Sequence, residues 1–417
     1  MRSPGAIIIG GYINGLGLVR ALAARNIPVA VITTEPYDIA HRSRYVVAHA
    51  SAAGLDEQPE LLVELLDRRA AEWPGWALFP TNDGALAALS MHHDRLASKY
   101  RIIAPLFEIV RYFLDKELML GAARGIGMDV PHCYGAAVHA HAALADLRFP
   151  VLVKPYAGHM FFSHFGCKLF TARNHEDLGR CISQVENAKI PCGIFDFIPG
   201  PDSRIYAYCL YIDQNGEPGP GLLVRKLRQS PPFFGVARVA EVAGDHPELR
   251  TATIELLRRI GYCGMVSAEF KLDPRDNTFR FMEVNGRSVI YNGLLRKAGL
   301  DLGGLAWSDC VERRPERARP NGWPGVWINL HADLLYSTFY RRLGRVSFGD
   351  FLRPYARPKI DAVRTVRDPA PSMVQWSRTA REGTSALLRC RFRKLIAQRI
   401  HPLSCIGSES AGGRRLA

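Results

Sequence analysis

The chain has 417 residues and a net charge of +14, and 47% of its residues are hydrophobic and 23% charged. This length allows two or three domains with sizeable cores, and the composition excludes a disordered or fibrous protein. The nine cysteines contain no C-x-x-C pair, which argues against a disulfide framework or zinc knuckle and favours a reducing compartment. No window approaches the roughly 18 uninterrupted apolar residues of a spanning helix, and we expect a cytoplasmic protein without a signal peptide.

The positive charge is concentrated at the C-terminal end of the chain. Residues 341–417 contain 17 lysines and arginines against 5 acidic residues, an excess of 12, which leaves +2 for residues 1–340. Residues 1–340 are nearly neutral and so do not carry the basic surface expected of a nucleic-acid-binding domain. We therefore expect no nucleic-acid partner, and a basic, arginine-rich extension over residues 314–417.

The N-terminal segment is typical of a βαβ unit. Apolar runs at 6–9 and 29–32 flank a glycine-rich turn at 10–17 and a helix. Tyr12 stands where the second glycine of G-x-G-x-x-G should be, so a nucleotide-free Rossmann-like domain is favoured over a dinucleotide site. Further elements are expected at 60–71 (helix), 76–79 (strand) and 84–96 (helix). We place this first domain at residues 1–112.

A β-hairpin is predicted in the second half of the chain, and it carries two glutamates. Strands over 266–272 and 278–284, joined by a turn centred on Asp276, place Glu269 opposite Glu283. Opposed like charges on neighbouring strands are destabilising, and both glutamates have apolar neighbours in sequence. A divalent cation is therefore the natural neutralising group.

The residues after Glu283 add to this candidate cation site. With a side-chain period of two, Asn285 and Arg287 project from the same face as Glu283, supplying a further oxygen ligand and a fixed cation. Two carboxylates and an amide oxygen, with no His or Cys, describe a site for magnesium or manganese of the kind that holds nucleotide phosphates. The alternative is a surface hairpin with solvated glutamates.

Two lysines lie where they could meet a phosphate. An apolar strand at 151–153 runs into Lys154, and a buried ammonium there needs an anion. Lys116 follows Asp115 at a helix start, where backbone N–H groups also favour phosphate. Either lysine alone could be solvated or salt-bridged, but together with the hairpin they indicate a nucleoside triphosphate.

In their order and spacing, the motifs of residues 1–313 resemble the ATP-grasp superfamily, in its carboxylate-amine ligase branch, nearest the D-aspartate-ligase-like proteins. The motifs are Asp115-Lys116, Val153-Lys154-Pro155, Ile198-Pro199-Gly200-Pro201-Asp202, Arg225-Lys226-Leu227-Arg228, Glu269-Phe270-Lys271 and Glu283-Val284-Asn285-Gly286-Arg287. The resemblance implies an α/β plus α+β architecture. A Rossmann-like pre-ATP-grasp domain (1–112) would precede an ATP-grasp domain (113–313) and the basic, helical C-terminal extension (314–417).

The resemblance also implies which residues bind the nucleotide. Lys116 and Lys154 would contact the ATP phosphates. The backbone of Asp196 and Ile198 would hold adenine, and Asp202 would hold the ribose.

Further residues are implied around the transferred phosphate. The metal ligands would be Glu269, Glu283 and Asn285, binding two magnesium ions. Lys226 or Arg228 would reach the γ-phosphate or acyl phosphate, and Arg287 would bind the carboxylate being activated.

The activity implied by the resemblance is ATP-dependent ligation of a small carboxylate to an amine through an acyl phosphate, with magnesium-ATP as the phosphoryl donor. The loop at 157–168 is bulkier than the usual glycine-rich loop, which leaves its phosphate contacts open. The alternatives are a non-catalytic nucleotide-binding protein and an NAD-linked oxidoreductase. A homodimer is also considered, and a helix at 385–400 would either contact an anionic membrane at its inner face or pack on the body.

Overall fold

The computed structural model describes residues 4–55, 58–136, 147–156, 161, 164–230, 234–335 and 347–378. It forms two compact units, the first comprising residues 1–130 and 199–375 and the second residues 131–198 and 376–417. The helix expected at 385–400 and most of the loop at 157–168 lie outside the described residues, and the domain limits at 112 and 313 stay predictions. Within the described ranges, no helix is both long enough and apolar enough to cross a membrane.

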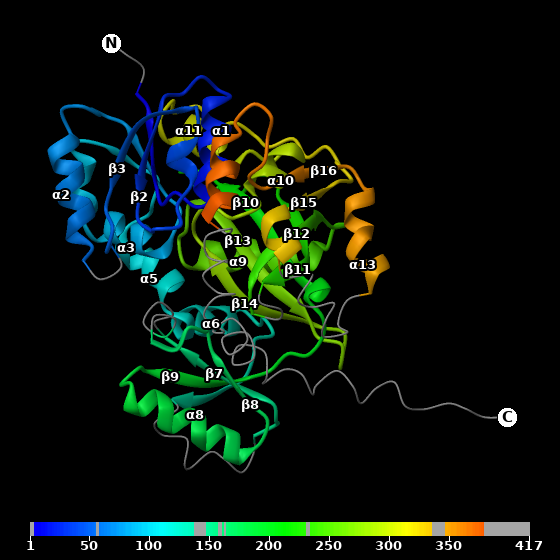
Figure 1. Ribbon diagram of the computed structural model, residues 1–417. Helices are drawn as coiled ribbons and strands as arrows, with labels where there is room; N and C mark the ends of the chain where they lie inside the picture. Colours follow the sequence, from blue (N-terminus) through cyan, green and yellow to red (C-terminus); the bar gives the residue numbers. More distant parts are fainter. Residues whose placement is uncertain are drawn as a thin grey trace. The chain divides into compact units, whose positions relative to one another are not determined.

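A parallel sheet of order β3-β2-β1-β4-β5 forms the N-terminal part of the first unit (Figure 1). Its strands are β1 (Ala6–Ile9), β2 (Val29–Thr33), β3 (Val46–Ser51), β4 (Ala77–Pro80) and β5 (Arg101–Ile102). The helices of this part are α1 (Ile13–Ala23), η1 (Ala40–Arg42), α2 (Glu60–Arg69), α3 (Asp83–Met91) and α4 (His93–Ala97). Strands β1, β2 and β4 are buried along their whole length, as expected for a parallel sheet covered on both faces.

The predicted βαβ opening is confirmed, and one predicted helix is wrong. The segment expected as a single helix at 84–96 is divided into α3 and α4 at His92. His92 has non-helical backbone angles (φ −108°, ψ 25°), so α3 ends there, while its carbonyl accepts from the N–H of Leu96 and starts α4.

A second sheet in the first unit has the order β14-β13-β10-β11-β12-β15-β16, antiparallel except for the β15–β16 pair. Its strands are β10 (Ile205–Ile212), β11 (Leu222–Ser230), β12 (Val236–Val242), β13 (Gly264–Leu272), β14 (Phe279–Asn285), β15 (Val326–Ile328) and β16 (Lys359–Asp361). The helices around it are α5 (Phe107–Leu114), α6 (Lys116–Arg124), η4 (Asp202–Arg204), α9 (Pro247–Arg259), α10 (Asn292–Lys297), α11 (Leu302–Cys310), α13 (Phe348–Leu352) and η5 (Arg353–Ala356).

The two sheets of the first unit share one hydrophobic core. That core joins side chains of β1, β2 and α1 to side chains of β10, β11, α10 and α11. Helices α1 and α11 pack so closely that a Cβ atom on Gly303 would lie 2.9 Å from Leu18 (Figure 1). The Rossmann-like part is therefore packed directly onto the part that carries the predicted hairpin.

The segment beyond residue 313 was expected to be helical or irregular, and this is wrong for β15 and β16. Val326, Trp327 and Ile328 are fully buried, and β15 pairs with β12 and β16. Each strand has only three residues and β15 follows three prolines, so no period-two pattern is visible in the sequence. Part of the expected extension therefore completes the second sheet.

Two fully buried aspartates fix this C-terminal segment. Asp333 accepts hydrogen bonds from Arg228 (2.6 and 2.9 Å) and from the Tyr355 hydroxyl (2.6 Å). Asp368 accepts from Arg20 (3.0 Å) and from the Ser43 hydroxyl (2.8 Å). The last described segment is thus tied both to β11 and to the N-terminal part.

The second unit contains an antiparallel sheet of order β6-β9-β7-β8. Its elements are β6 (Cys133–Ala136), β7 (Val151–Pro155), β8 (Phe170–Ala172), α8 (His175–Asn187) and β9 (Cys192–Asp196). Asn174 caps α8 by accepting from the N–H of Asp177, and the apolar face of α8 packs on β7 and β9. The strand predicted at 151–153 is confirmed and continues to Pro155, and Ile198 lies two residues beyond the end of β9.

Candidate active site

The hairpin formed by β13 and β14 opposes the two glutamates as predicted, although the pairing nearer the turn differs by one residue from the predicted register. Glu269 lies opposite Glu283, and Ser267 lies opposite Asn285. A bulge after this point leaves Met282 without an opposing residue, because Phe270 pairs with Phe281. The two predicted carboxylates therefore face each other, with Asn285 on the same side of β14 as Glu283.

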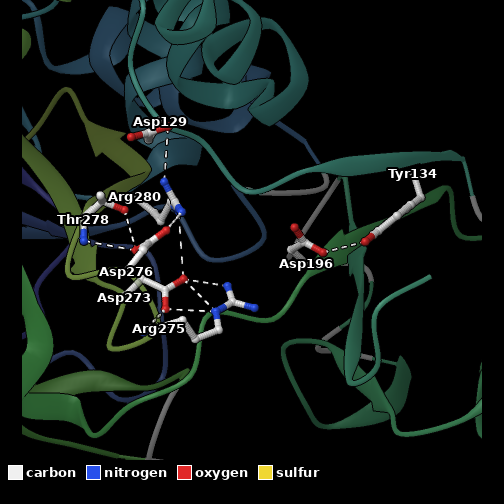
Figure 2. Close-up of polar contacts among 8 residues, drawn as sticks. All are labelled: Asp129, Tyr134, Asp196, Asp273, Arg275, Asp276, Thr278 and Arg280. Carbon is white, nitrogen blue, oxygen red and sulfur yellow. Dashed lines mark hydrogen bonds and ion pairs between the residues drawn. The ribbon is translucent and has the colours of Figure 1, made fainter. Parts of the chain in front are cut away.

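The turn of this hairpin is fixed by its own polar residues (Figure 2). The backbone N–H of Asn277 donates to the Asp273 carbonyl and that of Asp273 to the Thr278 carbonyl, both at 2.8 Å. Asn277 adopts the left-handed conformation (φ 57°), which asparagine tolerates. Burial raises the pKa of Asp273, but hydrogen bonds from Arg275 outweigh this effect and hold the pKa below its ordinary value. Local chemistry thus fixes the turn, and the bulge at Met282 then brings Glu283 opposite Glu269.

The hairpin is also attached to the chain segment before the second unit. Arg280 on β14 forms an ion pair with Asp129 (3.2 Å) and bonds to Asp276 in the turn (Figure 2). The N–H of Phe281 donates to the Asp129 carbonyl at 2.7 Å. These contacts restrain β14 at the edge of the sheet.

Lys226 is brought into direct contact with one glutamate of the facing pair, Glu269. Its Nζ lies 2.6 Å from the Oε2 of Glu269, and the two side chains are only 7% and 15% exposed. Lys226 belongs to β11 and reaches Glu269 across the intervening strand β10, where Ile205 pairs with Lys226. The predicted phosphate lysine and the predicted metal ligand therefore share one polar face.

The side chain of Arg228 is held in a separate cluster around Asp333. Its Nε and Nη2 donate to Asp333, its Nη1 donates to the carbonyls of Asp350 and Phe351, and its guanidinium lies over the rings of Phe351 and Tyr355. These contacts use most of its donors in a buried ion cluster. Of the two residues considered for the γ-phosphate, the geometry favours Lys226.

Arg287 follows β14 and contacts the N-terminal part. Its Nε donates to the Oδ1 of Asp83 at 2.6 Å, and the side chains of Arg287 and Asp83 are 20% and 58% exposed. Burial lowers the pKa of Arg287, but the carboxylates of Asp83, Glu283 and Glu269 outweigh this effect and raise the pKa above its ordinary value. Arg287 is thus a fixed cation within the electrostatic reach of the glutamate pair.

Lys271 is a buried cation in the motif Glu269-Phe270-Lys271, and no role is predicted for it from the sequence. It is 3% exposed and lies on the same side of β13 as Glu269. Burial lowers its pKa to about 8, against the carboxylates of Asp202 and Asp273, which raise it. The signal in the sequence was the alternation Glu269-Phe270-Lys271.

Two predicted nucleotide-binding residues lie in the first unit. Lys116 is the first residue of α6, as expected, and Asp115 caps that helix by accepting from the N–H groups of Glu117 and Leu118. Asp202 accepts from the backbone N–H (2.9 Å) and the side-chain amide (3.1 Å) of Gln229 on β11. Both roles stay predictions.

The remaining predicted residues lie in the second unit. Lys154 is on β7 with its Nζ 5.5 Å from the centroid of the Phe195 ring. Asp196 ends β9, its carboxylate accepts from Tyr134 (2.7 Å, Figure 2), and its N–H donates to the His132 carbonyl. The predicted adenine contact of Asp196 would therefore have to use its carbonyl oxygen, and the roles of Lys154, Asp196 and Ile198 stay predictions.

The donor set of the hairpin is that of a hard cation. Within the part of the chain that the structure describes, no group of three or more His, Cys, Asp and Glu side chains is arranged for a metal. The protein donors are thus two carboxylates, Glu269 and Glu283, and the amide of Asn285. Magnesium is commonly held by one or two carboxylates together with water and substrate phosphates, so the residues fit that ion.

Comparisons of sequence with known proteins agree with this geometry. The family model described as "Carbamoyl-phosphate synthase L chain, ATP binding domain" matches residues 243–302, which include the hairpin. A D-aspartate ligase from Enterococcus faecium is 26% identical over 173 residues. That match covers 40% of this chain and 41% of the ligase, so the chain matches less than half of that relative's length.

Comparisons of structure extend over most of the chain. A biotin carboxylase in complex with β,γ-ATP from Campylobacter jejuni has a TM-score of 0.60 at 19% identity, covering 77% of this chain and 74% of its own. An N5-carboxyaminoimidazole synthetase from Staphylococcus aureus has a TM-score of 0.60 at 16% identity, covering 81% and 87%. The chain therefore has a mixed α/β fold of the ATP-grasp type, and its resemblance to the ATP-grasp superfamily is confirmed.

Proposed function

We propose that this protein is an ATP-dependent carboxylate-amine ligase that uses magnesium or manganese. The observation that carries the proposal is the register of the β13–β14 hairpin, which opposes Glu269 to Glu283 while Lys226 lies 2.6 Å from Glu269. Facing carboxylates with a neighbouring ammonium form a polar face suited to a divalent cation and phosphate oxygens. The similarity to a D-aspartate ligase and to an ATP-bound carboxylase supports the same reaction class.

Each residue of this polar face has a role in the proposed reaction. Glu269, Glu283 and Asn285 would hold magnesium, which supplies charge neutralisation for the phosphates when it is bound. Lys226 would bind oxygens of the γ-phosphate, and Arg287 would bind and orient the carboxylate substrate.

The reaction would proceed in two steps. A carboxylate oxygen attacks the γ-phosphorus of ATP, and the bond to the bridging oxygen breaks, releasing ADP and forming an acyl phosphate. The amine nitrogen then attacks the acyl carbon, phosphate leaves, and the nitrogen loses a proton to give the amide. Little covalent chemistry falls to the protein in such a phosphoryl transfer, whose catalysis is mostly positioning and charge stabilisation.

Nucleotide binding is the first test. ATP with MgCl2 should raise the melting temperature of the protein, since a ligand that binds only the folded state stabilises it by RT ln(1 + [L]/Kd). ATP with EDTA should raise it less, and NAD should leave it unchanged. A shift with NAD and none with ATP would overturn the proposal in favour of the oxidoreductase.

Turnover is the second test. Carboxylates and amines screened in pairs with ATP and MgCl2 should include a pair that releases ADP and phosphate in equal amounts with the amide. Stabilisation by ATP without ADP release from any pair would instead indicate a nucleotide-binding protein without ligase activity.

A further inference from the structure

A cavity of about 490 Å³ lies on the face of the second sheet that is turned away from the glutamate pair. One row of its floor crosses three neighbouring strands: Tyr206 on β10 pairs with Phe270 on β13, and Phe270 pairs with Phe281 on β14. Side chains alternate between the two faces of a strand, so Phe270 and the adjacent Glu269 project to opposite sides. The sheet itself therefore separates this cavity from the proposed metal and phosphate groups.

Aromatic rings from three separate elements form the wall of this cavity. Tyr206 on β10, His246 just before α9 and Phe279 on β14 meet edge to face, with ring centroids between 5.1 and 5.9 Å apart. All three side chains stay partly exposed. Their rings therefore keep apolar surface that a ligand in the cavity can cover.

The charged groups that line the cavity are carboxylates. Among the described residues its lining includes Asp129 and Glu248 and neither lysine nor arginine, although the chain has a net charge of +14. Asp129 already forms an ion pair with Arg280 at 3.2 Å (Figure 2). Glu248 contacts the Nδ1 of His246 at 3.0 Å, and its side chain is 58% exposed. The surroundings thus favour a cation over an anion, with Glu248 as its main counter-ion.

We propose that this cavity binds an organic cation, an amine with an apolar body, whose ammonium lies against Glu248 and the rings of Tyr206 and Phe279. Aromatic faces attract cations, and the apolar floor takes up the body of the ligand. The volume falls in the range of about 300–1,000 Å³ that small-molecule sites occupy. A ligand bound here is distinct from the amine that the proposed ligase would join, because the sheet lies between this cavity and Glu269.

The test compares three probes that share one apolar body and differ in charge. They are phenethylamine, the neutral phenethyl alcohol and the anionic hydrocinnamate, and saturation-transfer NMR titrations give their dissociation constants for the full-length protein. The variants are E248Q, which removes the counter-ion, A252W, which places a large side chain at the helical wall of the cavity, and E255Q, an exposed glutamate of the same helix outside the lining. Circular dichroism and stabilisation by ATP with MgCl2 are measured on every variant.

We expect phenethylamine to bind about threefold or more tightly than the alcohol, as a cation–π contact with a partly exposed ion pair allows, and hydrocinnamate to bind most weakly. E248Q should weaken binding of the amine by about the same factor and leave the alcohol unchanged. A252W should weaken both at least about tenfold by occupying the cavity, while stabilisation by ATP with MgCl2 persists. E255Q should behave as wild type.

Several results would overturn the inference. These are no binding of the amine to the wild type, equal binding of amine and hydrocinnamate, equal effects of E248Q on amine and alcohol, or unchanged binding in a folded A252W. Loss of both amine binding and ATP stabilisation in a folded A252W would place the amine on the ATP face and also overturn it. If A252W does not fold, the comparison of amine and alcohol in E248Q decides. Absence of ATP stabilisation in the wild type would overturn the proposed function and leave the amine site standing.

Discussion

The ammonium of Lys226 meets only one of the two facing carboxylates in this site. Lys226 contacts Glu269 at 2.6 Å, while Glu283 on the outer strand is exposed. Two like charges that face each other across strands favour a divalent ion between them. Two substitutions separate the contributions of the carboxylate and the ammonium.

Replacing Glu283 with glutamine should abolish turnover while the fold is kept. The exposed side chain contributes little to packing, but losing one carboxylate should weaken magnesium and misplace the γ-phosphate, reducing kcat on the order of a thousandfold. ADP release measures the rate and circular dichroism the fold. E255Q, an exposed glutamate on α9, is the matched control. Wild-type turnover in E283Q would refute the metal assignment.

Replacing Lys226 with methionine should lower stability in the absence of divalent ions by about 1–3 kcal/mol, because Glu269 then loses the ammonium that lies 2.6 Å from its carboxylate. MgCl2 should raise the melting temperature of K226M more than that of the wild type, since the two carboxylates attract the ion more strongly once the ammonium of Lys226 is gone. K99M, which breaks an ion pair of the partly exposed Asp67, is the control. Equal magnesium shifts in K226M and wild type would contradict this account.

Two histidines pack against each other beside the first sheet. His41 in η1 and His49 on β3 stack with ring centroids 4.6 Å apart, and His49 also bonds to the Thr33 hydroxyl (3.1 Å). Burial, the neighbouring His49 and Arg42 lower the pKa of His41 to about 4. Burial likewise lowers the pKa of His49.

This pair should make the protein sensitive to mild acid. Because the folded-state pKa of His41 lies below its unfolded value of 6.5, its contribution to stability is present above pH 6.5 and is lost as the pH falls toward 4. H41Q should flatten the decline of the melting temperature over this range by about 2–4 °C, a figure reduced for the partial exposure of His41. H175Q, on an exposed residue of α8, should keep the wild-type slope. An unchanged slope in H41Q would argue against the pair.

The hairpin was predictable because its information is local. The turn residues from Asp273 to Asn277 and the alternation of the strands predict the hairpin and nearly fix its register. The pairing next to the turn, Leu272 with Phe279, would place Glu269 opposite Met282, and the bulge at Met282 shifts the register by one residue so that Glu269 lies opposite Glu283. The partner of Arg287 could not be predicted in this way, since Asp83 lies 204 residues away and an exposed aspartate after an asparagine cap looks like an ordinary helix start.

Other elements escaped prediction for a related reason. Arg228 shares a motif with Lys226, but the buried Asp333, 105 residues later, decides where its side chain goes. The strands β15 and β16 are three residues long, too short for a side-chain period. They form because β15 pairs with the edge of β12 and β16 then pairs with β15. Pairings over long sequence distances thus set what local patterns leave undetermined.

At the scale of the whole molecule, Asp368 connects the last described segment to the first. Its buried carboxylate receives Arg20 of α1, the Ser43 hydroxyl and the backbone N–H of Arg44. Arg20 also donates to the carbonyl of Val363 at 2.8 Å. The C-terminal segment is therefore bonded to helix α1 and to the loop at Ser43 and Arg44 in the N-terminal part of the first unit.

Replacing Asp368 with alanine should cost about 3–5 kcal/mol of unfolding free energy, because it leaves Arg20 and the Ser43 hydroxyl without their buried acceptor. D368N, which keeps an acceptor oxygen, should lose less. Urea unfolding followed by circular dichroism gives both values, with D94A as the exposed control. A loss below about 1 kcal/mol in D368A would show that the contact is dispensable.

The connection through Asp368 also has a consequence for the order in which the molecule is completed during synthesis. Arg20 and Asp368 are 348 residues apart, which at a translation rate of about 5–20 residues per second corresponds to about 20–70 s. During that interval the N-terminal sheet has left the ribosome while the carboxylate that will hold α1 has not yet been made. The nascent N-terminal part must therefore persist without this contact, and a chain that stops short of residue 368 lacks the carboxylate that accepts hydrogen bonds from both Arg20 and Ser43.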